Sequence, residues 1–325
     1  MSKTREMTAP LLEISHLSVM LKKRRDRLKA VDDLSFKVYP GEILGLVGES
    51  GAGKSMTGSA ILGLIDPPLY ISSGEIIFDG NRIDQNASSI RGSKISMIFQ
   101  DPLVSLNPLR KIGDQLVEAI RTHINMSKAE AFDRAKTLLA EVGIDPRRIN
   151  AYPHTFSGGM RQRVVIALAL APEPSLIIAD EPTTALDVSV QAQILDLLKR
   201  LCREHGTSII LITHDMGVIA ETTDRVAVLY AGRLAEIGET ASVLKSPRHP
   251  YTKGLVAATP RIDADSYKKK LFQIPGAMPD LEQIPQGCAF HPRCDFANAQ
   301  CKIQQPPLFE DRSACWLLKD GSEIS

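Results

Sequence analysis

The phosphate-binding pattern G-x-x-x-x-G-K-[ST] is met at every fixed position by Gly48-Glu49-Ser50-Gly51-Ala52-Gly53-Lys54-Ser55. Its glycines allow a tight turn in which successive backbone N–H groups converge on phosphate oxygens at a helix N-terminus. Lys54 would bring a positive charge to the terminal phosphates, and the Ser55 hydroxyl suits Mg²⁺. The alternative is a glycine-rich turn without a ligand, and the later motifs argue against it. The octet therefore predicts a nucleoside triphosphate site.

An acidic pair, Asp180 and Glu181, ends the apolar run that begins at Leu176. An Asp at the end of such a strand can hold Mg²⁺ through water in phosphate-loop NTPases. The second carboxylate, just beyond the metal ligand, is placed to polarise an attacking water. Alone, an Asp-Glu pair is usually a solvated surface feature. Its position after an apolar strand favours the catalytic interpretation.

Three further segments follow in order along the chain. Gln100 comes after the strand-like run 95–99, and His214 comes after the apolar strand 208–213. Between them, Ser157-Gly158-Gly159 opens a helix that we expect to reach Ala171, before Pro172 stops it. A serine and two glycines at a helix start can form an anion site, and Ser157 can also serve as the helix cap.

This ordered set of motifs resembles that of the ATP-binding-cassette (ABC) ATPases. The resemblance implies that Glu181 is the catalytic base and that His214 senses the γ-phosphate. It also implies that Gln100 links the γ-phosphate and the metal to a transmembrane partner. ATP and Mg²⁺ are the expected cofactors, with Ser55, Gln100 and Asp180 at the metal.

The same resemblance implies a dimer. In this family the Ser-Gly-Gly segment of one subunit, here Ser157-Gly158-Gly159, closes over ATP held by another subunit. Asp187 lies in a stretch that resembles the family's D-loop, which runs along the dimer seam. The family pattern more often has Gln where Met160 stands, a change that leaves the serine and both glycines in place.

One departure from the family concerns adenine. The family usually stacks the base on an aromatic residue before the strand that leads to the phosphate loop, but the segment 16–30 contains no Phe, Tyr or Trp. Leu21, Arg25 or Arg27 could replace the stacking contact.

Two phrases resemble the importer branch that handles oligopeptides, dipeptides and some nickel complexes. The first is Asp101-Pro102-Leu103-Val104-Ser105-Leu106-Asn107-Pro108, and the second is His249-Pro250-Tyr251-Thr252-Lys253-Gly254-Leu255. The resemblance implies an ATPase subunit of a peptide importer, with a related ATPase, two permease subunits and an extracytoplasmic binding protein as partners. Nickel, glutathione or another small solute is the alternative cargo, and a soluble non-transport ABC ATPase is the alternative function.

Composition and hydropathy limit where the chain works. The formal net charge of +1 gives no reason to expect nucleic acid as a partner. The N-terminus lacks the apolar core of a signal peptide, and no apolar stretch approaches the ~20 residues of a membrane-spanning helix. We therefore expect a cytoplasmic protein, or one that reaches the membrane by docking on partners. The resemblance to importer ATPases implies a peripheral position on the cytoplasmic face of the inner membrane.

The expected fold is α/β, a phosphate-loop ABC cassette with a mostly parallel sheet core. An antiparallel β subdomain would contain strands 12–19 and 30–38, joined by a basic loop at 22–29. The resemblance places the ATPase domain at 8–258, with a helical subdomain at about 102–160, where Ser127 opens a helix with a capping box. Residues 259–325 would form a small, irregular extension.

Four of the five cysteines lie in this extension, at Cys288, Cys294, Cys301 and Cys315. In a reducing compartment, clustered thiols are better metal ligands than disulfide partners. Four thiolates can hold zinc or an iron–sulfur cluster, but the spacings lack the C-x2-C knuckle of common zinc sites. Because some resembling importer ATPases carry a [4Fe–4S] cluster here, we favour that cluster, with zinc or unligated thiols as alternatives.

Overall fold

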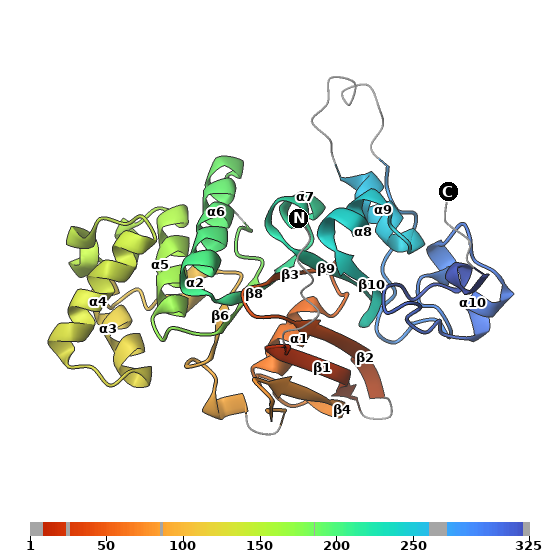
Figure 1. Cartoon of the computed structure of the whole chain (residues 1–325), viewed down its shortest axis with the longest axis horizontal. Coiled ribbons are helices and arrows are strands. Elements are labelled where there is room, and N and C mark those ends of the chain that lie inside the picture. The colour runs from red at the N-terminus through yellow and green to blue at the C-terminus, as the bar shows by residue number, and fades with distance from the viewer. Residues whose placement is uncertain (1–8, 24–26, 85–86, 185, 260–271, 321–325) are drawn as a thin grey trace, which may run out of the picture. The chain divides into compact units, whose positions relative to one another are not determined.

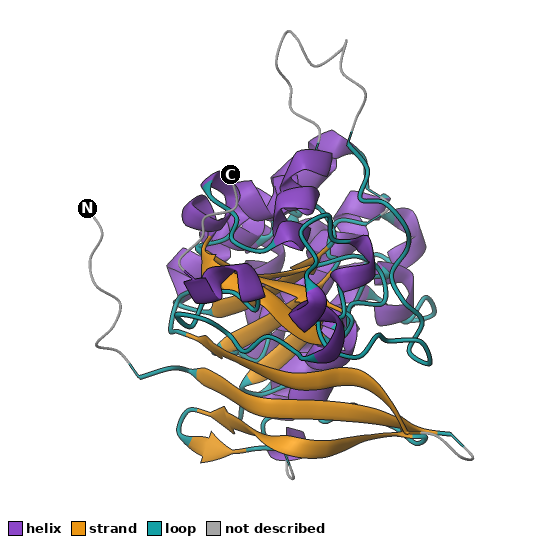
Figure 2. Ribbon diagram, turned by 90° about the vertical axis from the view of Figure 1, so that its right-hand side faces the viewer, coloured by secondary structure: helices purple, strands orange, loops and turns teal. Residues whose placement is uncertain are grey.

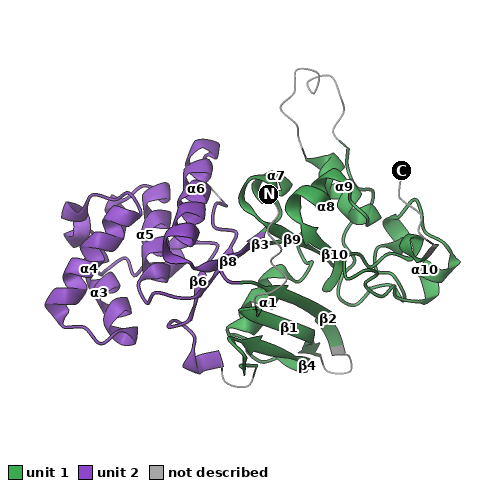
Figure 3. Cartoon of the chain, in the orientation of Figure 1, with its two compact units in different colours: residues 1–39, 44–86, 213–325 green, residues 40–43, 87–212 purple. Residues whose placement is uncertain are grey.

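The computed structural model describes residues 9–23, 27–84, 87–184, 186–259 and 272–320 (Figure 1). These fall into two compact units (Figure 3). Unit 1 comprises 1–39, 44–86 and 213–325, and unit 2 comprises 40–43 and 87–212. The cysteine-bearing extension therefore belongs to the same unit as the phosphate loop.

Unit 1 contains a four-stranded antiparallel sheet in the order β2-β1-β4-β5 (Figure 2). Its strands are β1 (Leu12–Lys22), β2 (Arg27–Val38), β4 (Leu69–Phe78) and β5 (Asn81–Arg82). This sheet confirms the antiparallel subdomain, but the prediction of a loop over 22–29 is wrong at both ends. Leu21 pairs with Leu28 and Lys22 with Arg27, so the hairpin continues almost to its tip. The charged residues of this segment suggested a loop, but the cross-strand pair of leucines favours strands.

The rest of unit 1 is built on strands β3 (Ile43–Val47), β9 (Arg225–Tyr230) and β10 (Arg233–Glu239). Strand β3 pairs parallel with β9, and β10 pairs antiparallel with β9. Every residue of β3 is buried, as its continuous apolar run predicts. The helices of this unit are α1 (Lys54–Ile61), α7 (Met216–Thr222), α8 (Thr240–Lys245) and α9 (Pro250–Ala258).

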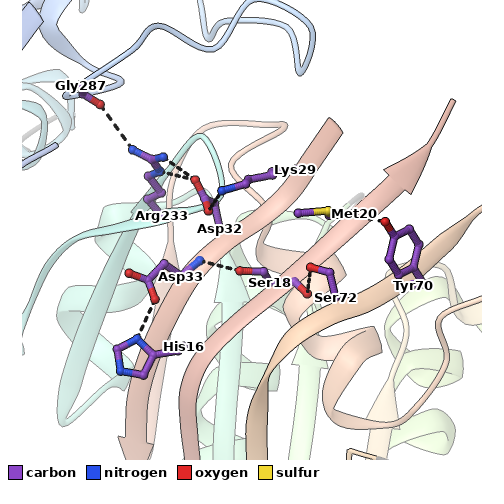
Figure 4. A network of polar contacts seen from close by, with 10 residues as sticks. All are labelled: His16, Ser18, Met20, Lys29, Asp32, Asp33, Tyr70, Ser72, Arg233 and Gly287. Atoms are coloured by element: carbon purple, nitrogen blue, oxygen red, sulfur yellow. Dashed lines mark hydrogen bonds and ion pairs between the residues drawn. The ribbon is translucent and has the colours of Figure 1, made fainter. Parts of the chain in front are cut away.

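The C-terminal extension packs against this sheet as an irregular lobe. Its described helices are short, with α10 covering only Ala299–Ile303, in agreement with the expected irregular extension. Ala289 and Phe290 enter the hydrophobic core of β9. Arg233 of β10 pairs with Asp32 of β2 and donates to the carbonyl of Gly287 at 3.4 Å, which ties the lobe to both strands (Figure 4).

Unit 2 contains parallel strands β6 (Ile95–Ile98), β7 (Leu176–Asp180) and β8 (Ser208–Thr213), with β7 between the other two. Helices α5 (Gly158–Leu170) and α6 (Val188–His205) follow the Ser-Gly-Gly segment and the acidic pair. Between Pro102 and Tyr152 the described chain forms helices without strands, as predicted. They are α2 (Pro102–Ser105), α3 (Ile112–His123) and α4 (Lys128–Glu141), the last opened by the predicted capping box of Ser127 and Glu130.

Within the ranges given above, none of the helices combines the length and the apolar character needed to cross a bilayer.

Candidate functional site

The phosphate loop leaves β3 and enters α1 in unit 1, so that it joins a strand to a helix. Close packing requires glycine at two of its positions. A Cβ on Gly48 would lie 2.2 Å from the carbonyl oxygen of Leu229, and one on Gly53 would lie 2.8 Å from that of Ala30. Gly53 also has a positive φ of 94°, a conformation that L-residues with side chains rarely adopt. The backbone is therefore held close to neighbouring strands.

Lys54 folds back over the loop. Its side chain is buried, and Nζ donates to the carbonyl oxygens of Gly48 and Glu49 at 2.8 and 3.1 Å. Ala52, fully buried, accepts the N–H of Gly232 at 3.0 Å. Ser55 is exposed at the start of α1. The loop thus carries a lysine folded onto its own carbonyl groups and an exposed serine hydroxyl, and its backbone is hydrogen-bonded to Gly232.

Glu49 has partners that the sequence did not reveal. Its N–H donates to the phenol oxygen of Tyr251 at 2.9 Å. Its carboxylate accepts two hydrogen bonds from Arg293, at 2.8 and 3.0 Å. Tyr251 belongs to the importer-like phrase, which gave it no role, and nothing in the sequence marked Arg293.

His214 also lies in unit 1, where it is exposed immediately after β8. The next residue, Asp215, caps α7 by accepting the N–H groups of Gly217 and Val218. The histidine is therefore fixed between a buried strand and a capped helix, as its predicted position at a strand end requires.

Unit 2 carries the acidic pair. Asp180 is 9 % exposed at the end of β7, and Glu181 has a positive φ of 45°. Such a conformation costs energy for a residue with a side chain and often occurs at functional sites. Two groups donate to the same oxygen of Glu181, Oε2: Nε2 of Gln100 at 2.8 Å and Oγ1 of Thr184 at 2.9 Å. The structure thus joins Gln100 to Glu181, while Thr184 was missed by the sequence.

The Ser-Gly-Gly segment begins α5 in the same unit. Ser157 is the N-cap and accepts the N–H of Met160 at 3.4 Å. Gly158 is exposed, and a Cβ on Gly159 would lie 2.5 Å from Cγ1 of Val190, so glycine lets α5 approach α6. Asp187 is the N-cap residue of α6.

Two regions of the chain match models of known protein families. Residues 31–184 match the model described as "ABC transporter", and residues 235–301 match the "Oligopeptide/dipeptide transporter, C-terminal region". The oligopeptide transport ATP-binding protein OppD of Bacillus subtilis is 48% identical over 307 residues, covering 92% of this chain and 86% of its own. The chain belongs to the ABC transporter ATP-binding family.

Other relatives and solved structures agree with this assignment. The dipeptide transport ATP-binding protein DppD of Bacillus subtilis is 46% identical over 96% of both chains. The dimeric post-hydrolysis structure of the ATP-binding cassette MJ0796 with ADP and Pi matches with a TM-score of 0.63 and 28% identity, covering 70% of this chain and 98% of that chain. CbiO1 from Clostridium perfringens matches with a TM-score of 0.65. The expected fold is confirmed, and the chain is an ATPase.

The adenine contact of this ABC ATPase stays a prediction. Arg25 lies outside the described residues, and for Arg27 the described structure covers only the backbone, in β2. Leu21 is half-buried and pairs with Leu28 across the hairpin.

The four cysteines of the extension are free; Cys301 and Cys315 are buried, and Cys288 and Cys294 are half-buried. Burial raises the pKa of Cys288, of Cys294 to about 11 and of Cys315 to about 12, and the neighbouring cysteines contribute to each increase. Across the described ranges, no three His, Cys, Asp or Glu side chains form a group that could hold a metal ion. The structure therefore does not support the iron–sulfur or zinc interpretation.

Proposed function

We propose that this chain is the ATP-hydrolysing subunit of an importer that takes peptides across the cytoplasmic membrane. The observation that carries the proposal is the presence of both matched regions in one chain, the ABC transporter region at 31–184 and the oligopeptide/dipeptide transporter region at 235–301. The relatives named above are oligopeptide and dipeptide transport proteins, aligned over more than nine-tenths of this chain.

The phosphate loop would bind the triphosphate of ATP. Backbone N–H groups of the residues after Glu49 face the phosphates, and Lys54 leaves its carbonyl partners to neutralise the terminal phosphates. The Ser55 hydroxyl, the Asp180 carboxylate and the Gln100 amide oxygen are hard oxygen donors, which is the ligand chemistry that Mg²⁺ prefers. When bound, Mg²⁺ would neutralise the charge that develops on the phosphate oxygens.

Hydrolysis would depend on Glu181 as the base that orients and deprotonates the attacking water. Support comes from the hydrogen bonds of Gln100 and Thr184, which fix one carboxylate oxygen. His214 would contact the γ-phosphate. Because phosphoryl transfer requires little covalent assistance, positioning and charge neutralisation account for most of the rate.

The working unit of the proposal is a dimer of ATPase subunits. Ser157, Gly158 and Gly159 would close over the ATP of the partner subunit, with Asp187 at the seam. The exposed serine and Gly158, and the solved dimer of the similar cassette MJ0796, support this arrangement. A related ATPase is the proposed partner.

The membrane partner would dock on unit 2, next to Gln100. This surface exposes large apolar side chains, with Leu103 59 %, Val104 83 % and Leu109 85 % exposed. Exposed apolar clusters commonly mark protein–protein contacts. Two permease subunits and an extracytoplasmic binding protein complete the proposed importer, which places this chain at the cytoplasmic face of the inner membrane.

The cysteines enter no step of this proposal. Anaerobic purification tests the point directly. A brown protein with visible charge-transfer absorbance would restore the iron–sulfur interpretation.

Uptake by cells tests the cargo. Deletion of the gene should abolish uptake of a radiolabelled tripeptide and dipeptide but leave nickel uptake unchanged. Wild-type chain should restore peptide uptake, and Glu181→Gln, as the matched control, should not. Normal peptide uptake in the deletion strain, or loss of nickel uptake alone, would overturn the peptide assignment.

A further inference from the structure

The second residue of the phosphate loop is held by residues of the C-terminal half of unit 1. The phenol oxygen of Tyr251 accepts the backbone N–H of Glu49, and the guanidinium of Arg293 grips its carboxylate with two hydrogen bonds. These contacts bridge 202 and 244 positions of sequence. Both the backbone and the side chain of Glu49 are therefore fixed from outside the nucleotide motifs.

The two residues that hold Glu49 are themselves packed and hydrogen-bonded. Tyr251 is fully buried, and its ring lies 4.7 Å from that of Tyr230 and 5.3 Å from that of Phe290, measured between centroids. Arg293 has a side chain that is 7 % exposed. Its Nε donates to the carbonyl of Pro275 at 2.7 Å, which orients the guanidinium fork.

The charge on Arg293 requires a partner. Burial by itself would lower the pKa of Arg293, but the hydrogen bonds that Arg293 donates to Glu49 and Tyr230 outweigh burial and raise the pKa. Bidentate pairs of a guanidinium and a carboxylate combine strong hydrogen bonds with a fixed geometry. Removing one partner leaves the other charge without compensation in a largely buried site.

The held peptide is next to the catalytic lysine. Nζ of Lys54 bonds to the carbonyl oxygens of Gly48 and Glu49, on both sides of the N–H that Tyr251 accepts. A rotation of the Glu49 peptide would therefore move the carbonyl groups that hold Lys54 before ATP binds. It would also turn the N–H groups of the residues that follow, which the phosphates need.

We propose that Arg293 and Tyr251 are positioning residues for ATP binding, and that the C-terminal extension sets the affinity of its own chain's phosphate loop by holding Glu49. The extension is then part of the ATP site's support. The inference depends on ATP binding by this loop and not on the nature of the cargo.

The test compares variants of the full-length chain by titration calorimetry with Mg-ATP. Arg293→Gln removes the charged fork, and Tyr251→Phe removes only the oxygen that accepts the Glu49 N–H. We expect the dissociation constant to rise about tenfold for Arg293→Gln, within the range of typical couplings between sites, and by a smaller factor for Tyr251→Phe. Arg248→Gln is the matched control, because Arg248 pairs with Glu310 away from the loop, and its dissociation constant should equal that of the wild type.

A double variant separates positioning from general destabilisation. If Arg293 acts through Glu49, Glu49→Gln combined with Arg293→Gln should bind no more weakly than Glu49→Gln alone. Arg293→Lys should recover part of the affinity. By reciprocity, Mg-ATP should also slow hydrogen exchange of the backbone around residues 288–294.

Three results would overturn the proposal. The first is a dissociation constant within twofold of wild type for Arg293→Gln and Tyr251→Phe. The second is fully additive loss in the double variant, and the third is hydrogen exchange at 288–294 that ATP leaves unchanged. Should Arg293→Gln fail to fold, Tyr251→Phe and the exchange measurement on the wild type decide the question.

Discussion

Nε2 of Gln100 donates to Oε2 of Glu181 at 2.8 Å, although 81 positions separate the two residues in the sequence. The contact joins the residue expected to sense the metal and the transmembrane partner to the expected catalytic base. A displacement of Gln100 would release a donor that holds this carboxylate oxygen together with Thr184. The base is thus sensitive to movement of the segment on which the permease is proposed to dock.

The first prediction concerns this base. Glu181→Gln keeps the size and an oxygen acceptor but removes the group that takes the proton. Turnover should fall by about 10²–10⁴, the range for general bases, while the affinity for Mg-ATP stays at the wild-type value. With the partner ATPase present, dimers should accumulate in size-exclusion chromatography at saturating Mg-ATP. Turnover within a few-fold of wild type would assign the base to another residue.

The second prediction concerns space behind the phosphate loop. Gly53→Ala places a Cβ 2.8 Å from the carbonyl oxygen of Ala30 and 3.2 Å from Cα of Gly232. The backbone must shift, so ATP binding should be lost and the melting temperature should drop. Gly80→Ala is the matched control, with a similar positive φ and nothing within 4 Å. It should lose roughly 1–2 kcal/mol of stability, the cost of a left-handed conformation for an L-residue, and bind ATP normally. Similar affinities for ATP in the two variants would contradict the steric argument.

Sequence patterns predicted the parts of the site that depend on local order. Strands β7 and β8 have the predicted bounds, because each is an apolar run that ends at a carboxylate or just before His214. The caps at Ser127 and Ser157 were equally visible, since a cap depends on residues within one helical turn.

The remainder depends on tertiary contacts that local patterns do not encode. Arg293 meets Glu49 because the extension folds back onto the β9 core, and Tyr251 meets it because α9 packs on the same core; the sequence marks neither approach. The tip of the β1–β2 hairpin was predicted as a loop from its charges, whereas the pairing of Leu21 with Leu28 decides its structure.

The third prediction concerns the pair formed by buried Asp32 and half-buried Arg233, shown in Figure 4. Asp32 is 6 % exposed and accepts hydrogen bonds from both Lys29 and Arg233. Burial alone would raise the pKa of Asp32, but these two partners outweigh burial and lower it. Asp32→Asn should therefore cost roughly 2–3 kcal/mol at neutral pH, because Arg233 loses its counter-charge.

Asp33→Asn is the control for this pair. Asp33 is exposed, contacts His16 and has a positive φ that asparagine tolerates, so the change should be close to neutral.

The sign of the pH effect follows from the lowered pKa of Asp32. Its stabilisation is complete above the unfolded pKa of about 3.9 and is lost as the pH falls through the folded value. Melting curves that show equal losses for Asp32→Asn and Asp33→Asn would exclude a special role for the buried pair.

The last prediction concerns His249, whose side chain is buried beneath the extension and accepts the N–H of Tyr251 at 3.0 Å. Burial disfavours the imidazolium and lowers the pKa of His249 to about 4. The unfolded chain binds this proton near pH 6.5, so stability is complete above that pH and declines as the pH falls toward 4. Between pH 7.5 and pH 5 the expected loss from this group is about 2 kcal/mol.

Nearby Glu236 changes stability in the opposite direction. Burial raises the pKa of Glu236, so its contribution to stability falls as the pH rises through this region. Comparing the wild type with His249→Asn cancels that term, because asparagine keeps an acceptor at the helix cap without titrating. Unfolding by urea can be followed through Trp316, the only tryptophan, which lies in the same unit as His249. The stability advantage of the wild type over His249→Asn should be about 2 kcal/mol larger at pH 7.5 than at pH 5. If this advantage does not change with pH, the pKa of His249 is the same in the folded and the unfolded chain, and the prediction is wrong.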